Sequence, residues 1–299
     1  STKRVTVITP VLTLLLVVAL VVLILLPSVE KTENYIPLLI VVVLIELGLL
    51  LKRKSTVSGD IGIIVYIALI LWEYFTAKVG MKNAMLYPAP ENVFNVITKD
   101  YAKILEGVGS SLRLLGAAFG IALTFGVGLG LLVGLSDRLS GTILPIVRVI
   151  SPIPPIIYSP YAVALLPSFR AASIFVITLT IFWSIFMSMV LGVREIDKKI
   201  MDSARTLNLS KGSLILHVLL PYSLPGIFNS VSVSVSTSFL VLTAAEMIGG
   251  TSGLGWYIKY YSDFANYSKV VFGIVMIGVV VTVLNVVLSL LRKAVIRWK

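Results

Sequence analysis

Long runs of apolar residues are the feature that most restricts how this sequence can fold. A helix needs about 20 mostly apolar residues to cross the hydrocarbon core of a bilayer. About eight runs of nearly this length can be counted. They cover residues 7–26, 35–51, 60–77, 106–134, 142–165, 171–192, 225–246 and 269–291. The sequence therefore predicts an all-α polytopic membrane protein with about eight transmembrane helices.

The composition excludes several kinds of chemistry. Of the 299 residues, 58% are hydrophobic and 13% are charged, whereas a soluble domain is nearer one half and one quarter. The chain has no cysteine and one histidine, His217. Thiol catalysis, disulfides and a histidine-based metal cluster are therefore excluded, and we expect no metal and no cofactor bound by this chain itself.

The excess of basic residues has a simple explanation in a membrane protein. The formal net charge is +11, but no basic run is interleaved with aromatic residues as in a nucleic-acid-binding surface. Lys and Arg concentrate in cytoplasmic loops, and here roughly fifteen basic residues share one side against about eight on the other. We expect a lipid membrane and no nucleic acid as partner, with both termini in the cytoplasm. The first run follows Lys3 and Arg4 and lacks a cleavage site, which favours a retained anchor over a signal peptide.

Two runs have unusual internal patterns. The run at 142–165 contains five prolines, which break a helix and are tolerated at membrane depth only where neighbours or water satisfy the freed carbonyls. The stretch VSVSVSTS at 231–238 alternates like a strand, but a lone strand cannot span a bilayer, so we predict a helix. Its small polar stripe either lines a pathway or packs against a neighbouring helix. The pathway candidates from the two runs are Pro154, Pro155, Ser230, Ser234, Thr237 and Ser238.

Charged and small residues inside the other runs have competing interpretations. Arg113 and Arg148 are candidates for attracting an anion, or their side chains reach an interface. Glu246 ends the seventh run, where it either shapes an outer gate or is satisfied by solvent or loop amides. The glycines Gly126, Gly130 and Gly134 recur every four residues, and this spacing favours close helix packing over contact with a substrate.

The stretch at 193–224 is the longest predicted cytoplasmic loop. Its charged, helical pattern predicts a short helix on the cytoplasmic face that is stopped by Pro221. In purely structural terms it is a solvated connector between two spans. It could also serve as a rigid handle through which a soluble partner moves the membrane helices.

This loop resembles the EAA loop of the binding-protein-dependent ABC importer permeases. The family pattern is Glu-Ala-Ala, three residues, Gly, and then an apolar stretch that ends in Leu-Pro. Asp202 stands in place of the Glu, Ser203 and Ala204 in place of the two Ala, and Asn208 in place of the Gly. Leu220 and Pro221 match at the expected spacing. Asn adopts a left-handed turn more readily than any residue except Gly, so the turn can be kept.

The rest of the chain resembles the nitrate, sulfonate and taurine branch of that family over residues 68–299. The supporting segments are Leu71-Trp72-Glu73, Pro88-Ala89-Pro90, Ser110-Ser111-Leu112-Arg113, Pro152-Ile153-Pro154, Ala245-Glu246-Met247-Ile248 and Ser252-Gly253-Leu254-Gly255. One departure is the segment at 164–168, where the family has an Ile-Leu-Trp-Phe-Gly-like sequence. The first two runs lie outside the resemblance.

The resemblance implies an organisation and partners. Residues 59–299 would form a six-helix type I ABC importer core in a prokaryotic cytoplasmic membrane, and residues 1–58 a two-helix extension. Two copies of the chain would enclose a pathway for a small anion such as a sulfonate, taurine, nitrate or bicarbonate. A solute-binding protein would deliver the solute, and two ATPase subunits would bind ATP and Mg and dock on the loop. The implied coupling residues are Asp202, Ser203, Ala204, Arg205, Asn208, Leu209 and Pro221.

Two other classes of function fit the sequence less well. An intramembrane enzyme needs a nucleophile with a base, paired aspartates or a metal cluster at membrane depth, and none is apparent, so we expect a chain that is not itself catalytic. An ion-coupled secondary transporter would explain the broken fifth run. It would show internal repeats, which are not visible, and it would have no use for a coupling loop.

Overall fold

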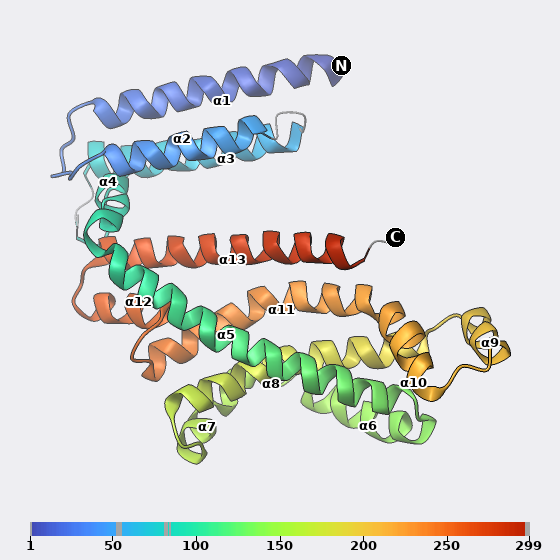
Figure 1. The fold of residues 1–299 in the computed structure, drawn as a ribbon. Helices are drawn as coiled ribbons and strands as arrows, with labels where there is room; N and C mark the ends of the chain where they lie inside the picture. Colours follow the sequence, from blue (N-terminus) through green and yellow to red (C-terminus); the bar gives the residue numbers. More distant parts are fainter. Residues whose placement is uncertain (1, 52–55, 81–82, 84, 297–299) are drawn as a thin grey trace. The chain divides into compact units, whose positions relative to one another are not determined.

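The computed structural model describes the backbone of residues 2–51, 56–80, 83 and 85–296, and the side chains of these residues apart from 2–10 and 56. Within these ranges every regular element is helical and no strand occurs. The VSVSVSTS stretch lies inside a helix, which confirms the prediction that it does not form a strand. The chain is therefore all-α, as the apolar runs predicted (Figure 1).

The helices follow one another along the chain with short connections. Their bounds are α1 Thr2–Leu25, α2 Ile36–Leu51, α3 Thr56–Glu73, α4 Pro90–Phe94, α5 Val96–Gly134, α6 Asp137–Ile150, α7 Ser159–Leu165, α8 Phe169–Arg194, α9 Lys198–Thr206, α10 Lys211–Leu214, α11 Leu220–Gly249, α12 Leu254–Asp263 and α13 Tyr267–Val295. Two π-helical turns cover Tyr74–Lys78 and Ile215–Leu219, and a 3-10 turn covers Pro155–Tyr158.

Five helices in the described residues are long and apolar enough to cross a membrane. They are Val57–Lys78, Val96–Gly134, Phe169–Arg194, Lys211–Gly249 and Tyr267–Val295. A sixth span results if α6 and Pro155–Leu165, bent by 80° at the proline-rich break, count together. These six correspond to the predicted six-helix core.

The helices of the first two predicted runs, Val11–Leu25 and Ile36–Leu51, are apolar but shorter. Residues 7–10 of the first run have no described side chains. The predicted division of the chain at residues 58 and 59 stays a prediction.

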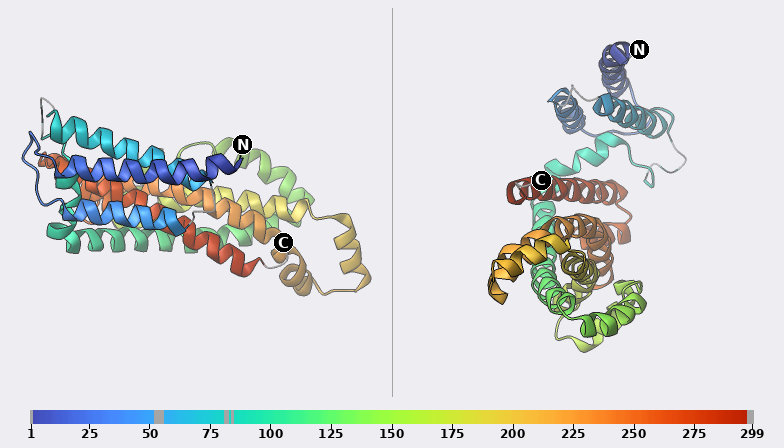
Figure 2. Two further views of the ribbon diagram at one scale, coloured as in Figure 1. Left: turned by 90° about the horizontal axis from the view of Figure 1, so that it is seen from above. Right: turned by 90° about the vertical axis from the view of Figure 1, so that its right-hand side faces the viewer.

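The contacts divide the chain into two compact units. One unit comprises Ser1–Leu105 and Tyr257–Val275, the other Glu106–Trp256 and Met276–Lys299, so that α5, α12 and α13 contribute to both. In the first unit α1 packs against α3, and α2 contacts α3 and α4 (Figure 2). The hydroxyl of Tyr66 on α3 donates to Glu46 on α2 at 2.9 Å. This contact satisfies the carboxylate in the second apolar run.

Aromatic residues of α12 lie inside the first unit. Tyr257 and Tyr261 are buried, with 1% and 7% of their surface exposed. The hydroxyl of Tyr257 donates to Asp100 at 3.1 Å, and Lys269 pairs with the same carboxylate at 2.6 Å. The two rings are therefore buried around a charged pair.

The second unit is built on α8 and α11, which lie side by side along their length (Figure 1). The glycines of α5 approach α8 closely, as their spacing predicted. A Cβ added at Gly130 would lie 2.7 Å from the Cβ of Met189, and one at Gly134 would lie 2.9 Å from the Cβ of Val193. Nearer the start of α5, at Gly116 and Gly120, the space is open: a Cβ added there would have no described atom of another segment within 4 Å. Close approach of the α5 glycines to α8 is therefore found at Gly126, Gly130 and Gly134 and not at Gly116 or Gly120.

Candidate functional site

The segment between α8 and α11 contains a short, well-capped helix. The Asp197 side chain accepts a hydrogen bond from the amide of Lys199 at 2.9 Å and caps the start of α9. The Ser210 hydroxyl caps α10 in the same way by accepting from the amide of Ser213 at 3.3 Å. Such caps satisfy amides that have no partner inside a helix. The predicted helix in this loop is present, at Lys198–Thr206.

Asn208 forms the turn that ends α9. Its φ is 49°, in the left-handed region. The amide of Asn208 donates to the carbonyl of Arg205 at 2.9 Å, and the amide of Leu209 donates to that of Ala204 at 3.3 Å. These two bonds are the pattern of a Schellman motif, which takes Gly or Asn at the left-handed position. The prediction that Asn keeps the turn geometry in place of Gly is confirmed.

The predicted coupling residues differ in exposure. Asp202 and Arg205 are exposed and form an ion pair at 3.6 Å, and Ser203 and Leu209 are also exposed. Ala204 is buried, with 6% of its surface exposed, so its small side chain lets α9 pack against its own chain. Leu207, which the sequence analysis did not select, is 72% exposed. The sequence signal that could have identified it is a large apolar residue directly after a charged helical segment that is expected to face solvent.

Pro221 does not stop a helix. It lies in the first turn of α11, and the helical path runs without a break from Lys211 to Gly249. The π-helical turn at Ile215–Leu219 directly precedes it. Because proline lacks an amide hydrogen and crowds the preceding turn, a wider turn accommodates it. The prediction that Pro221 ends the loop helix was wrong. The loop helix α9 ends instead at the turn formed by Asn208.

The second unit contains a cavity of about 610 Å³, which lies within the range of about 300–1,000 Å³ that is usual for small-ligand sites. Residues of the proline-rich break, α8 and α11 line it. Its polar lining consists of the hydroxyl groups of Ser151, Thr180, Ser184, Ser188, Ser230 and Thr237. None of the described residues that line it is charged. The cavity thus combines hydroxyl groups with apolar side chains such as Leu179, Met187 and Leu191.

The serine stripe of α11 has two roles. Ser230 and Thr237 line this cavity. Ser234 and Ser238 are buried, with 2% and 0% exposed, and the Ser238 hydroxyl donates to the backbone carbonyl of Ser234. Ser234 and Ser238 therefore pack inside the second unit, and for Ser230 and Thr237 a place along a pathway stays a prediction. On α8 the residues Thr180, Ser184 and Ser188 also line the cavity at a spacing of four. This spacing was the available signal that the sequence analysis missed.

The remaining pathway candidates lie around the proline-rich break. Pro155 lines the cavity, and Pro154 is exposed at the residue before the 3-10 turn. Arg148 is exposed on α6 and lines none of the cavities described here. The structure therefore does not bring together Arg113 and Arg148, the two arginines selected from the sequence.

Glu246 braces the loop that follows α11. The carboxylate is buried, with 2% of the residue exposed. It accepts hydrogen bonds from the Ser111 hydroxyl at 2.7 Å and the amide of Gly255 at 2.8 Å. The Ser111 oxygen in turn accepts from the amide of Leu254 at 3.0 Å. Of the two interpretations of Glu246, satisfaction by loop amides agrees with these contacts.

Arg113 lies beside this brace. It lines a cavity of about 360 Å³ together with Ser110, Ser168, Arg170, Glu246 and Ser252. Arg170, at the start of α8, was not a candidate from the sequence, because it follows a short polar link and resembles an ordinary loop residue. Neither guanidinium makes an ion pair within 4.0 Å in the described part of the chain.

The family model of binding-protein-dependent transport system inner membrane components matches residues 122–299. The match includes α8 to α11 and the capped α9 segment. Because it covers more than half of the chain, the chain belongs to this family, the permeases of ABC importers. It is a membrane component of an import system.

Curated relatives carry the names of several transported solutes. The nitrate import permease NrtB of Leptolyngbya laminosa is 31% identical over 63% of this chain and 68% of its own length. The taurine transport permease TauC of Escherichia coli is 26% identical over 83% of this chain and 91% of its own. The bicarbonate transport permease CmpB of Synechococcus elongatus is 30% identical over 63% and 68%.

A solved structure has the same fold. A chain of the inward-facing MetNI methionine ABC transporter superposes with a TM-score of 0.54, covering 66% of this chain and 98% of the other. The two are 19% identical. The expected type I ABC importer permease fold is thereby confirmed.

Proposed function

We propose that this chain forms the translocation pathway of an ATP-driven importer for a small anion and is not itself catalytic. In this proposal a solute-binding protein delivers the solute outside, and a separate ATPase binds ATP and Mg. Two copies of the chain enclose the pathway, and two ATPase subunits dock on them. The observation that carries the proposal is the α9 segment, whose capped helix and Asn208 turn present exposed residues to a partner.

The geometry of α9 suits a docking helix. Asp197 fixes its start and the Schellman motif fixes its end, so little ordering remains to be done on binding. Asp202, Arg205 and Leu207 supply a carboxylate, a guanidinium and an apolar side chain on the exposed surface. Ala204 is buried behind this surface, and Pro221 lies in the first turn of α11, at the far end of the same segment. We assign Ser203, Asn208 and Leu209 to its contact edge.

The cavity between α8 and α11 suits a pathway. Its hydroxyl lining replaces water around a small polar solute without the strong binding that a charged lining would cause. Ser230, Thr237 and Pro155 are the predicted pathway residues that line it. The likeness to nitrate, taurine and bicarbonate permeases and the two unpaired arginines support an anion as the solute.

The orientation follows from the coupling segment. We place α9 and both termini in the cytoplasm of a prokaryotic cell, in agreement with the distribution of basic residues. The loop braced by Glu246 is then on the outer side, because α8 and α11 each run from the α9 segment to the opposite end of the second unit (Figure 1). The solute therefore enters beside Arg113 and leaves near α9.

Co-purification of an ATPase tests this proposal. The tagged chain is purified in mild detergent from its own host, and stoichiometric partners are identified by mass spectrometry. We expect a subunit with a phosphate-binding loop, and we expect Asp202→Arg together with Leu207→Arg to abolish its recovery. Both residues are exposed, so the substitutions remove the contact without disturbing the core. The matched controls are Asp202→Glu, which restores the family residue, and Asn208→Gly.

The alternative is an ion-coupled secondary transporter, and the same experiment distinguishes the two. Recovery of the chain alone, under conditions that preserve complexes of this kind, contradicts the importer. Uptake driven by a proton or sodium gradient in proteoliposomes without ATP would then establish the alternative.

A further inference from the structure

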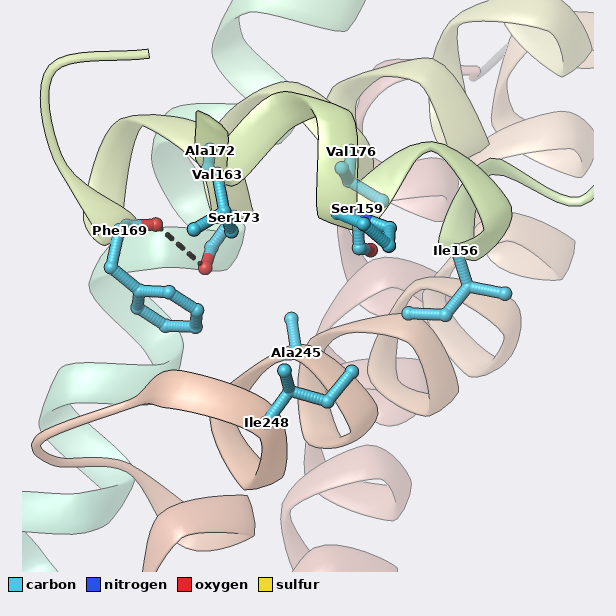
Figure 3. A pocket seen from close by; sticks show the side chains of 10 residues that line it. Ile156, Ser159, Val163, Phe169, Ala172, Ser173, Val176, Ala245 and Ile248 are labelled. Atoms are coloured by element: carbon cyan, nitrogen blue, oxygen red, sulfur yellow. Dashed lines mark hydrogen bonds between the residues drawn. The ribbon is translucent and has the colours of Figure 1, made fainter. Parts of the chain in front are cut away.

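Few side-chain oxygens in the described residues are both buried and without a hydrogen-bond partner. They belong to Ser159, Thr178, Glu73 and Glu91. Ser159 lies at the wall of an apolar cavity of about 250 Å³ in the second unit (Figure 3). Its hydroxyl, like that of Thr178, is uncharged and therefore costs far less to bury than an ionised carboxyl group. The two glutamates are thus the groups whose burial most needs a physical explanation.

Glu73 and Glu91 come from two segments that the proposed function does not use. Glu73 is the last residue of α3, and Glu91 lies in the first turn of α4, directly after the Pro-Ala-Pro segment at 88–90. The indole nitrogen of Trp72 donates to the carbonyl of Pro88 at 3.0 Å and joins the two segments. The sequences Leu-Trp-Glu and Pro-Ala-Pro-Glu therefore each bring one carboxyl group to the same place in the first unit.

The two carboxyl groups are almost fully shielded from water. Glu73 is 0% exposed and Glu91 is 1% exposed. Glu91 lies within reach of a side-chain hydrogen bond to Glu73, yet both oxygens of Glu73 and one of Glu91 have no donor among the described residues. Carboxylates are acceptors only. The two groups can therefore form a hydrogen bond with each other only when one of them carries a proton.

One cation faces the pair. The Lys78 ammonium lies 3.3 Å from Oε1 of Glu73, and it donates to the carbonyl of Leu26 at 2.7 Å and to the Ser28 hydroxyl at 2.8 Å. It offsets one negative charge. Two ionised carboxylates would leave a second charge buried without a counterion, which is strongly disfavoured in apolar surroundings. One proton on the pair removes that charge.

The other charged groups around the pair have partners or different neighbours. The described side chains of α1 carry no charge. Glu30, in the link after α1, lies beside Gly80, where an added Cβ would be 3.5 Å from its carboxylate. The groups with partners of their own are Glu46 with Tyr66, Glu33 with Lys99 and Asp100 with Lys269. The charge of the pair is therefore left to Lys78 and to a proton.

We propose that Glu73 and Glu91 form a binding site for one shared proton, and that this proton holds α4 against the end of α3. The protonated carboxyl group donates its O–H to the other carboxylate, whose charge is balanced by Lys78. Loss of the proton leaves two carboxylates that repel each other, so α4 is released. Because α4 leads through Asn95 directly into α5, the proton controls how firmly the start of that long helix is held. The site shares no residue with the proposed importer machinery and is tested independently of it.

The direction of the pH dependence follows from the number of protons bound. The closed pair binds one proton, whereas in the open form both carboxyl groups reach water and are ionised at neutral pH. The closed form is therefore favoured at lower pH and is lost as the pH rises through the titration of the pair. A difference of one proton changes the opening equilibrium by up to about tenfold per pH unit. In acid the open form is also protonated, and the dependence disappears.

Hydrogen exchange of the purified protein in a neutral detergent tests this site between about pH 5 and pH 9. The quantity measured is the protection factor of the amides at 91–95, which is corrected for the intrinsic pH dependence of exchange. We expect protection to be constant in acid and to fall by up to about tenfold per pH unit at higher pH. The amides at 198–206 in α9 are the internal reference, and their protection should not follow this curve.

Matched variants assign the dependence to the pair. Glu73→Gln and Glu91→Gln each replace one carboxyl group by an amide of similar shape that donates at every pH. Each should abolish the fall in protection at 91–95. Each should also remove an infrared band of a protonated carboxyl group that the wild-type protein shows at neutral pH. Glu106→Gln is the control, because Glu106 is exposed and forms no ion pair with the described residues.

Three outcomes would overturn the proposal. Protection at 91–95 that does not change with pH, or a change that persists in both glutamine variants, excludes a shared proton. The absence of a protonated carboxyl band from the wild-type protein at neutral pH excludes it as well, and this measurement needs no variant to fold. Stabilisation of α4 by Ca²⁺ or Mg²⁺ that requires both glutamates would assign the pair to a metal ion instead.

Discussion

Two residues with positive φ flank the long helical segment Lys211–Gly249, and they differ in what they tolerate. Asn208 has φ 49° and lies in an exposed turn. Gly253 has φ 119° and lies against the Glu246 carboxylate, where an added Cβ would be 2.2 Å from the carboxyl carbon. The first position requires only a backbone conformation, which Asn can adopt. The second also requires the absence of a side chain.

The largest effect is expected at Gly253. Gly253→Ala should destabilise the second unit by about 4 kcal/mol, because backbone strain and overpacking each contribute about 1–3 kcal/mol. Thermal unfolding of the purified protein in detergent measures this. The double variant with Glu246→Ala should lose less than the sum of the two single variants, since it clears the space that the new Cβ needs. Strict additivity would show that backbone strain alone makes glycine necessary here.

An intermediate effect is expected at a glycine that has no positive φ. Gly130 lies in α5, and a Cβ there would be 2.7 Å from the Cβ of Met189. Gly130→Ala should cost about 1–3 kcal/mol through overpacking alone. Gly120→Ala is the control within the same helix, because its surroundings are open, and it should be neutral or stabilising by up to about 1 kcal/mol. Equal effects at the two glycines would contradict close packing of α5 on α8.

The smallest effect is expected at the exposed turn. Asn208→Ala should weaken the Schellman motif by about 1 kcal/mol, because alanine disfavours the left-handed conformation. Asn208→Gly should change it by only a few tenths of a kcal/mol. Hydrogen exchange of the amides at 198–210 measures the local stability. Faster exchange in the glycine variant than in the alanine variant would contradict the role assigned to this turn.

Local patterns in the sequence predicted much of the fold. Apolar run length located the spans, and the interpretation of VSVSVSTS as a helix was confirmed because backbone groups in a membrane need internal partners. The left-handed turn at Asn208 was also predictable, since it depends on one residue type and its immediate neighbours. The wrong prediction at Pro221 shows the limit of this approach. At Pro221 a π-helical turn precedes the proline and the helix continues, and this turn is not visible in the sequence.

The parts of the site that depend on distant residues were not predictable. The brace joins Glu246 to Ser111 and to the amide of Gly255, and no local pattern relates α5 to the end of α11. Arg170 joins Arg113 only because the α7–α8 link returns to α5. Ser234 and Ser230 resemble each other in sequence, yet one is buried and the other lines a cavity. Their difference depends on how α11 is rotated against α8.

The uninterrupted segment Lys211–Gly249 has a mechanical consequence. At 1.5 Å per residue its 39 residues extend about 58 Å. Because closely packed interiors transmit strain, a displacement of the chain beside α9 would be carried along this helix toward Glu246. The π-helical turn at Ile215–Leu219 is the place where the rod can shift its register. In the proposed importer, one helical element would thus connect the docking segment α9 with the loop that follows α11.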